Sequence, residues 1–291
     1  MPRILKADDA IQALEEIVIE PASAIVTPTL GVVIAQESDK TKPDWTYLKQ
    51  IHKRASKYGA VVDVFDVSNT SDAYKAVAEM RNNEKYDGIV ILSTFLDGRD
   101  QYLKNYIPTP LDLDCSSSQA LGHMICDKSK TFYRSAPCTA SAVYKLLQYN
   151  QVELEGKKVG VVGRSTRVGR PTAQLMSMAD ATVTLYHSKS DLSTLKDEDI
   201  VISAVGKPKF LTADMFREGQ TVVDVGINCV DGKLCGDVDY DNVCAVLGDS
   251  GAITPVPNGI GPLTNTILFS KLFVNAIRMR GGHSPNGAEL C

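Results

Sequence analysis

The sequence lacks a strong net charge and lacks paired cysteines. Its formal net charge is −4 at pH 7, which gives no electrostatic reason to expect nucleic acid or an anionic membrane as a partner. Its seven cysteines are odd in number and contain no C-x-x-C pair. Neither a disulfide framework nor a metal site is therefore expected, and a reducing compartment fits this pattern best.

The sequence also lacks any apolar run of about 18 residues, so no membrane-spanning helix is expected. No charged-then-apolar signal opens the chain, and we therefore expect a cytoplasmic protein. What remains is the composition of a soluble globular protein, 44% apolar and 23% charged. Its 291 residues are enough for one large or two modest domains.

Short apolar runs alternate with segments of helical periodicity along the whole chain. The runs expected to form strands are 30–35, 60–67, 88–92, 158–162, 181–186, 200–205 and 221–225. The segments expected to form helices are 8–19, 44–58, 71–82, 139–149 and 263–280. Because strands that alternate with helices build parallel sheets, both halves of the chain are predicted to be α/β.

The most informative segment joins a buried strand to a helix through a turn with glycines at 163 and 169. It reads V-G-V-V-G-R-S-T-R-V-G-R-P from Val159 to Pro171. Glycines let the backbone approach a ligand, and the first turn of a helix offers unpaired N–H groups and a dipole that favours an anion. The segment predicts a phosphate site, although its G-x-S-x-x-V-G spacing departs from G-x-G-x-x-G and a plain strand-to-helix turn is the alternative.

The segment after the next strand indicates which nucleotide is bound. An acidic residue there would bind a ribose 2′-hydroxyl, whereas hydroxyl and basic groups suit a 2′-phosphate. His187, Ser188 and Lys189 occupy this segment, and no acidic residue occurs before Asp191. NADP is therefore the expected cofactor, with NAD as the second choice and a solvated basic loop as the alternative without a ligand.

Several motifs occur in the order found in the methylenetetrahydrofolate dehydrogenase/cyclohydrolase (FolD-like) family, which the chain resembles from about Asp112 to Ala276. They are P-C-T at 137–139, G-R-S-T-R-V-G-R-P at 163–171, V-G-K-P at 205–208, D-V-G-I-N at 224–228, G-D-V at 236–238 and T-P-V-P-N-G-I-G-P-L-T at 254–264. The resemblance implies two α/β domains with the active cleft between them, and a homodimer. These are a folate-binding catalytic domain (1–144 plus 262–291) and a Rossmann-like NADP-binding domain (145–261).

The resemblance also implies an oxidoreductase of one-carbon metabolism that converts 5,10-methylenetetrahydrofolate to the methenyl form. Tyr47 would pack over the folate ring and Asp114 would hold the pterin, and these two are the expected catalytic residues. The remaining substrate-binding residues would be Pro255, Pro257, Gly259, Gly261 and Pro262. The cofactor-binding residues would be Gly163, Arg164, Ser165, Val168, Gly169, His187, Ser188, Lys189, Gly206, Pro208, Gly226, Asn228 and Thr264, with Arg164 and Ser188 at the 2′-phosphate.

The chain departs from the family at paired positions. If Gly59 closes the helix 44–58, Tyr47 falls on the family tyrosine and Ile51 on the catalytic lysine, while Leu92 replaces the glutamine that partners this lysine. Lys49 lies two residues away, about 200° around a helix, and would point elsewhere. Losing both groups predicts weak or absent cyclohydrolase activity, since hydrolysis of the methenyl product needs general acid–base help.

Further departures leave two alternatives open. Asn258 and Cys115 stand where the family has glycine, and Ser93, Thr94 and Ser116 to Ser118 also differ. One alternative is a bifunctional enzyme in which another residue replaces the lysine, for example Lys49 if the loop 36–42 shifts the helix. The other is a pseudoenzyme that binds folate or nucleotide, against which the intact glycine turn argues.

Overall fold

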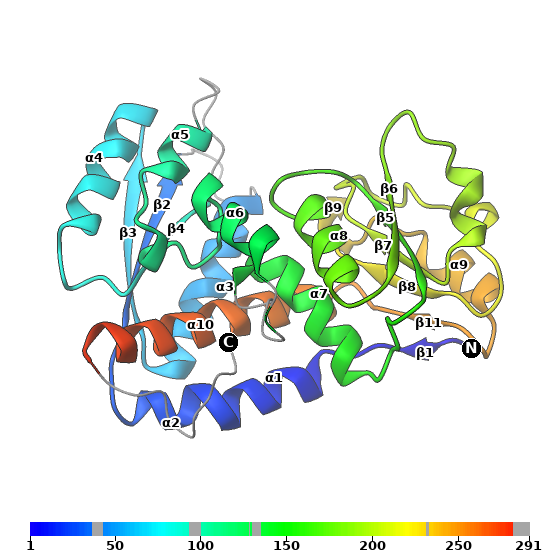
Figure 1. Ribbon diagram of the computed structural model, residues 1–291, viewed down its shortest axis with the longest axis horizontal. Helices are drawn as coiled ribbons and strands as arrows, with labels where there is room; N and C mark the ends of the chain where they lie inside the picture. The colour runs from blue at the N-terminus through cyan, green and yellow to red at the C-terminus, as the bar shows by residue number, and fades with distance from the viewer. Residues whose placement is uncertain (37–42, 93–99, 128, 130–134, 231–232, 282–291) are drawn as a thin grey trace. The chain divides into compact units, whose positions relative to one another are not determined.

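The computed structural model describes residues 1–36, 43–92, 100–127, 129, 135–230 and 233–281 (Figure 1). The chain divides into two compact units. Unit 1 comprises Met1–Ile11 and Thr139–Thr264, and unit 2 comprises Gln12–Cys138 and Asn265–Cys291. Among the described residues, no helix has both the length and the apolar character needed to cross a membrane.

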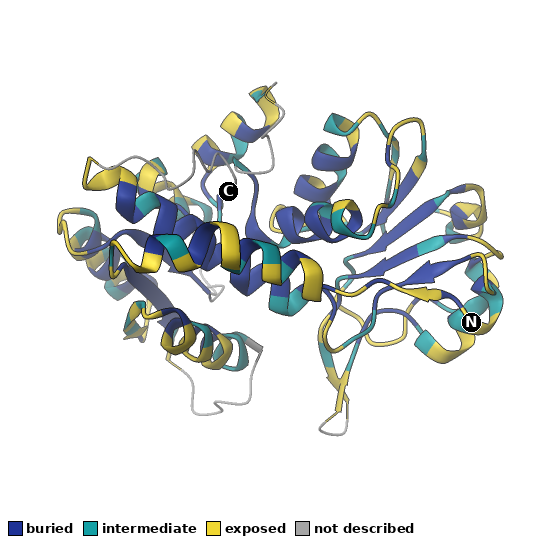
Figure 2. Cartoon of the chain, turned by 90° about the horizontal axis from the view of Figure 1, so that it is seen from below, coloured by how far each residue is buried: buried dark blue, intermediate teal, exposed yellow. Residues whose placement is uncertain are grey.

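Unit 1 is built on a six-stranded sheet in which every neighbouring pair is parallel. In spatial order its strands are β1 (Arg3–Ile4), β11 (Ala252–Ile253), β8 (Thr221–Asp224), β7 (Ile200–Ser203), β5 (Lys158–Val162) and β6 (Thr182–Tyr186). The central strands are buried, as expected for a parallel sheet covered on both faces, and Figure 2 shows them in dark blue. The order reverses at β5, and ligands of such open sheets bind beside this switch point.

The other elements of unit 1 surround this sheet. They are α7 (Cys138–Tyr149, from Thr139 on), α8 (Gly169–Met178), η4 (Leu192–Asp197), η5 (Ala213–Met215), α9 (Tyr240–Leu247) and the antiparallel pair β9 (Asn228–Val230) and β10 (Lys233–Cys235). Apolar side chains of the strands, η4 and α9, among them Val222, Leu195 and Leu247, form its core.

Unit 2 contains a three-stranded parallel sheet in the order β3 (Val61–Val67), β2 (Thr29–Ala35) and β4 (Gly88–Ile91). Its helical elements are α1 (Asp8–Leu14, from Gln12 on), the π-helix η1 (Glu15–Ile19), α2 (Glu20–Ser23), α3 (Pro43–Tyr58), α4 (Thr70–Arg81), α5 (Asp100–Asn105), η2 (Thr109–Leu111), α6 (Ser118–Cys126) and α10 (Ile260–Met279, from Asn265 on). The α/β class predicted for both halves is thus confirmed.

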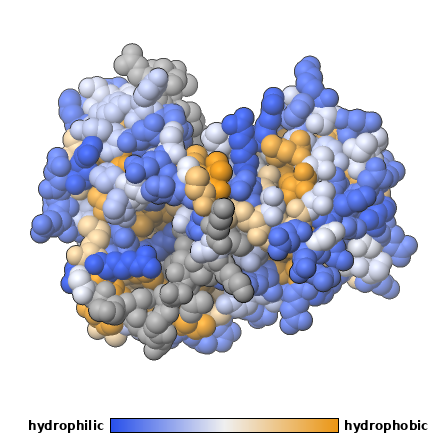
Figure 3. All heavy atoms as spheres, viewed as in Figure 1, coloured by the Kyte–Doolittle hydropathy of each residue, from blue (hydrophilic) through white to orange (hydrophobic). Residues whose placement is uncertain are grey.

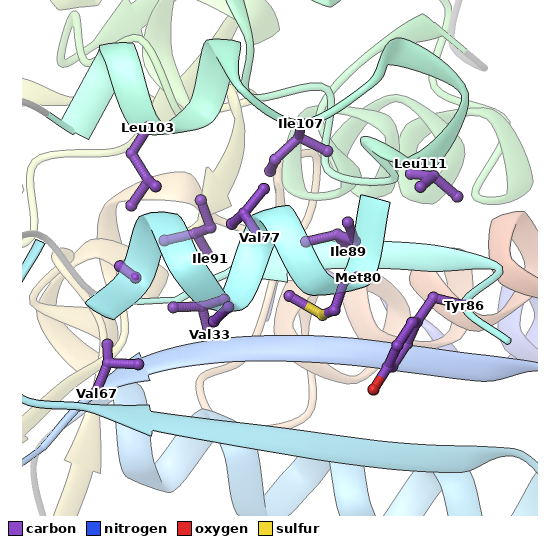
Figure 4. Close-up of a cluster of buried hydrophobic side chains, with 12 residues drawn as sticks. Val33, Val67, Val77, Met80, Tyr86, Ile89, Ile91, Leu103, Ile107 and Leu111 are labelled. Carbon is purple, nitrogen blue, oxygen red and sulfur yellow. The ribbon is translucent and has the colours of Figure 1, made fainter. Parts of the chain in front are cut away.

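One core cluster of unit 2 lies between α4 and the sheet (Figure 4). Met80 and Val77 of α4 pack there with Val33 of β2 and Ile89 of β4, and all four residues are 0% exposed. At the surface, hydrophilic side chains predominate on the face drawn in Figure 3. The apolar runs of the sequence therefore supply the side chains that pack between the two sheets and the helices covering them.

The two units differ from the sequence-based division (1–144 plus 262–291, and 145–261) in where residues 1–11 belong. Arg3 and Ile4 form β1, which pairs with β11 at the edge of the sheet of unit 1, so the first strand belongs to the nucleotide-binding unit and not to the folate-binding domain expected from the sequence. Unit 1 also includes residues 139–144 and 262–264, which the sequence-based division assigned to the other domain. The side-chain amide of Asn150, just after α7, donates to the carbonyl of Lys6 at 2.9 Å and ties this end of α7 to the first segment.

Candidate functional site

Two glycines close the turn between β5 and α8, and neither could carry a side chain. Gly163 has a φ of +116°, and a Cβ on it would lie 2.2 Å from the carbonyl oxygen of Ala204. A Cβ on Gly169 would lie 1.9 Å from the carbonyl oxygen of Gly163. The tight strand-to-helix turn predicted from the sequence is therefore present, with the amino end of α8 packed against the end of β5.

Ser165 organises the rest of this turn. Its Oγ accepts hydrogen bonds from the amides of Val168 at 3.2 Å and Gly169 at 3.4 Å. Arg164 and Arg167 are exposed next to it in the chain. The turn thus combines two cations with the positive end of a helix dipole, an arrangement that favours a bound anion.

The segment after β6 lies at the same edge of the sheet. The amide of Gly163 donates to the carbonyl of Tyr186 at 3.0 Å, so the turns that follow β5 and β6 start side by side. Ser188 and Lys189 follow Tyr186 and are exposed, as Arg164 is. Hydroxyl and basic groups from two neighbouring turns are therefore available to a phosphate group at this edge.

The first acidic residue of this segment already has a structural role. Oδ1 of Asp191 accepts a hydrogen bond from the amide of Ser193 at 2.9 Å and caps η4. Before it, His187 is half-buried, and its Nδ1 accepts a hydrogen bond from the amide of Lys189 at 3.1 Å. Asp191 is thus engaged at the start of η4 instead of standing in for a ribose-binding carboxylate.

A buried carboxylate, which the sequence-based site did not include, holds the loop after β7. Asp237 is 0% exposed and accepts hydrogen bonds from three consecutive amides, those of Val205 (2.7 Å), Gly206 (3.0 Å) and Lys207 (3.0 Å). It also accepts one from the side-chain amide of Asn228 at 2.9 Å. Two of the predicted cofactor residues, Gly206 and Asn228, are therefore joined through one anion.

A second buried carboxylate supports the first. Asp224, at the end of β8, accepts hydrogen bonds from the amides of Gly226 (3.0 Å), Asp237 (3.0 Å) and Val238 (2.9 Å). A Cβ on Gly226 would lie 2.1 Å from Oδ1 of Asp237, so only glycine fits between the two acids. Burial, aided by the charge of Asp237, raises the pKa of Asp224 to about 6 against the opposing effect of the amides.

The loop after β11 is shorter than expected, because α10 begins at Ile260. Asn258 has a φ of +76°, which confirms that asparagine can take the left-handed conformation at this position. A Cβ on Gly259 would lie 2.5 Å from the carbonyl oxygen of Pro255. Thr264 lies on the first turns of α10, where its hydroxyl donates to the carbonyl of Ile260 at 3.1 Å.

The other residues expected in this loop have different exposures. Pro257 is exposed, whereas Gly261 and Pro262 are half-buried. Pro208, in the loop after β7, is also exposed.

The predicted cofactor residues other than Thr264 follow the carboxyl ends of four parallel strands, β5 to β8. This edge of the sheet is where α/β proteins bind their ligands.

In unit 2, Asp114 lies in a firmly held segment. Its Oδ1 accepts a hydrogen bond from the amide of Cys138 at 3.1 Å, and its side chain is half-buried. Cys115, in the family's glycine position, has a φ of +47°. The buried Asp112 accepts hydrogen bonds from the amides of Ser116 (3.0 Å) and Ser117 (2.8 Å) and fixes the chain that follows.

Helix α3 carries Tyr47 half-buried and turns Ile51 into the core. Ile51 is 0% exposed, Lys49 is exposed, and Gly59 ends the helix with a φ of +74°. Leu92, just after β4, is 2% exposed. Ser93 and Thr94, and the loop from 37 to 42, lie outside the described residues.

The sheet of unit 1 and its glycine turn define an α/β protein of the dinucleotide-binding class. Residues 137–280 match the family described as tetrahydrofolate dehydrogenase/cyclohydrolase, NAD(P)-binding domain. The bifunctional protein FolD of Macrococcus caseolyticus is 36% identical over 260 residues, which cover 87% of this chain and 88% of that protein. The Staphylococcus aureus protein of the same name is 34% identical over 284 residues, 95% of each chain.

Solved structures of this family are also similar to the chain. The methylenetetrahydrofolate dehydrogenase-cyclohydrolase (FolD) of Trypanosoma brucei, complexed with NADP cofactor and inhibitor, has a TM-score of 0.84 and 27% identity and covers 95% of this chain and 98% of that chain. The Campylobacter jejuni enzyme has a TM-score of 0.83 and 28% identity over 95% and 99%. The chain therefore belongs to the tetrahydrofolate dehydrogenase/cyclohydrolase family.

Proposed function

We propose that the chain is an NADP-linked 5,10-methylenetetrahydrofolate dehydrogenase whose cyclohydrolase activity is weak or absent. Its family membership supports the folate substrate, and the NADP held by the Trypanosoma brucei relative supports the cofactor. We also propose, from the resemblance, that it works as a homodimer in the cytoplasm. The observation that carries the proposed specialisation is the pair of buried hydrocarbon side chains at Ile51 and Leu92.

The dehydrogenase reaction depends more on how the protein positions the folate and the cofactor than on proton transfer by a side chain. A hydride leaves the methylene carbon for the nicotinamide ring, and a lone pair of the adjacent folate nitrogen stabilises the methenyl cation that forms. NADP supplies the hydride acceptor when bound. The chain itself needs to orient two flat rings against each other, so the reaction is compatible with the loss of a general base.

The residues of unit 1 suit NADP. Arg164 and Ser188 start from neighbouring turns and can surround a 2′-phosphate, while Asp191 is occupied as a cap. The hydrogen bonds that Asp237 accepts from the amides of Val205 to Lys207 hold this loop in one conformation at the sheet edge where a dinucleotide would bind. Gly163 and Gly169 let β5 and α8 pack closely against each other, and the amino end of α8 that this packing brings to the sheet edge would favour the pyrophosphate.

The residues of unit 2 suit the pterin. A carboxylate such as Asp114 accepts paired hydrogen bonds from an aminopyrimidine edge, and such charge-assisted bonds are strong and directional. The amide of Cys138 fixes one of its oxygens. Tyr47 is half-buried on α3 and would contribute an aromatic face to the folate ring.

Hydrolysis of the methenyl product makes a different demand. Water has to be activated and a folate nitrogen assisted, and neither an isoleucine nor a leucine can donate or accept a proton. The purified protein, mixed with methylenetetrahydrofolate and NADP, should accumulate methenyltetrahydrofolate, which is detected by its absorbance. The accumulated amount should exceed the amount left by an enzyme that also hydrolyses this product. Absence of both NADPH and methenyl absorbance would identify a pseudoenzyme.

The second candidate is a bifunctional enzyme, which the names of the relatives favour. Lys49 would then take the role of the lysine, although it is exposed and two residues from Ile51. Lys49→Met separates the candidates, because it should remove hydrolysis of added methenyltetrahydrofolate only if Lys49 has this role. Ile51→Ala is the matched variant that should leave such hydrolysis unaltered.

A further inference from the structure

Lys271 is a buried lysine on α10, with 8% of its surface exposed. Its Nζ donates to the carbonyl oxygens of Ala136 at 2.5 Å and Leu113 at 3.3 Å, and lies 3.8 Å from Sγ of Cys115. A buried ammonium is tolerated only where hydrogen bonds replace its lost hydration. The bonds of Lys271 to two separate segments meet this requirement and link these segments to α10.

Both segments lead to Asp114. Leu113 immediately precedes Asp114, and Ala136 lies two residues before Cys138, whose amide donates to Oδ1 of Asp114 at 3.1 Å. The thiol of Cys138 also donates to the carbonyl of Leu113 at 3.5 Å. Burial raises the pKa of this thiol well above its ordinary value, so it remains a neutral donor. One ammonium therefore fixes the chain that carries the carboxylate and the chain that holds one of its oxygens.

The chain that follows Cys115 is held independently of Lys271. Asp112 binds the amides of Ser116 and Ser117, as described above, and Ser117 caps α6 by accepting a hydrogen bond from the amide of Ala120 at 3.1 Å. Loss of the ammonium would therefore loosen the two segments around Leu113 and Ala136 that support Asp114, while α6 stays anchored. A change confined in this way should alter the direction of the carboxylate and leave the fold in place.

We propose that Lys271 is a positioning residue for substrate recognition: it aims the Asp114 carboxylate at the paired N–H donors of the folate aminopyrimidine edge. This inference rests on the proposed function, in which Asp114 holds the pterin. Lys271 touches no substrate in this role. It acts through the two backbone segments that converge on Asp114.

The test is a double-mutant cycle on the dehydrogenase reaction with Lys271→Met, Asp114→Asn and the double variant. Lys271→Met should lower kcat/KM for methylenetetrahydrofolate about 10- to 100-fold, the usual cost of misplacing a positioning group. The KM for NADP should stay within about twofold, since no cofactor contact changes. In the Asp114→Asn background, Lys271→Met should cost about twofold or less, because coupled residues are not additive.

Controls separate this role from simple stability. Lys145→Met removes another buried lysine, 6% exposed on α7, and should not raise the KM for folate. If Lys271→Met does not fold, Lys271→Gln, which keeps an N–H donor, takes its place in the cycle. Equal losses of Lys271→Met in both backgrounds, or a matching rise in the KM for NADP, would overturn the inference alone. Unchanged folate kinetics in Asp114→Asn would overturn the pterin assignment and this inference with it.

Discussion

At the scale of single residues, Arg164 is the side chain on which the preference for NADP over NAD is expected to rest. Arg164→Ala should weaken NADP binding by about 1.5–3 kcal/mol, the typical worth of a hydrogen bond to a charged group, or about 10- to 150-fold in Kd. NAD binding should barely change, because NAD has no 2′-phosphate. Titration calorimetry with both cofactors measures this difference.

Arg170→Ala is the matched control for Arg164→Ala. Arg170 is also exposed and lies on the first turn of α8, but it is six residues further along the chain. It should leave the affinity for either cofactor within about twofold, the size of an ordinary surface effect. Equal losses of NADP and NAD affinity in Arg164→Ala would remove the 2′-phosphate assignment.

At the scale of elements, the contact between β5 and α8 makes Gly169 sensitive to one added methyl group. Gly169→Ala would put its Cβ against the backbone carbonyl of Gly163, which cannot move as a flexible side chain could. We expect a loss of about 1–3 kcal/mol in the free energy of unfolding, typical of overpacking, and weaker binding of NADP and NAD alike. Urea denaturation and cofactor titration measure the two effects.

Gly122 of α6 provides the comparison for Gly169. A Cβ on Gly122 meets nothing within 4 Å, so Gly122→Ala should be neutral or stabilise by about 0.5–1 kcal/mol, as expected within a helix. Wild-type stability and cofactor affinity in Gly169→Ala would mean that the turn is looser than its geometry indicates.

The same turn illustrates what the sequence could predict. β5 begins at Lys158 and ends at Val162 as expected, because a short run of β-branched residues bounded by turn residues identifies a buried strand by itself. Glycines that take a positive φ or meet backbone, such as Gly163, are likewise local signals. The carboxyl end of α3 was also predictable, from Gly59, whereas the helix begins at Pro43, one residue before the expected start, with Asp44 inside its first turn.

Other features depend on contacts between distant parts of the chain. The three amides that Asp237 binds are 30 to 32 residues away in the sequence, so no local pattern assigns this role to the acid. Helix α6 has only nine residues, too few for a clear period, and was not predicted. β1 has two residues and exists through its pairing with β11, which explains why residues 1–11 were assigned to the other domain.

At the scale of the whole molecule, Asp224 should make folding stability depend on pH. Its pKa is about 6 in the folded chain and 3.8 as the ordinary value. Between these values the folded state binds more protons than the unfolded state, so the contribution of Asp224 is complete below pH 3.8 and is lost as the pH rises through about 6. Two pKa units correspond to about 3 kcal/mol at most.

Comparison with Asp224→Asn, which does not titrate, isolates this contribution. The stability of the wild type relative to this variant should decrease by about 1–3 kcal/mol between pH 4 and pH 7. Urea unfolding at several pH values in this range measures it. A constant difference would show that the amides balance the burial of Asp224, and a difference that grows with pH would show that they outweigh it.

The central claim is that this member of the family keeps the hydride transfer and has lost the hydrolysis. The loss of general acid–base help usually costs about 10² to 10⁴ in rate, enough to bring an enzyme close to the background reaction. The decisive measurement is the decay of added methenyltetrahydrofolate at neutral pH with and without the purified protein, whose NADP-linked dehydrogenase activity is confirmed in the same preparation. We predict that the protein does not hydrolyse it faster than buffer does. A clear acceleration that disappears in Lys49→Met but persists in Ile51→Ala would contradict this claim and show that the enzyme is bifunctional.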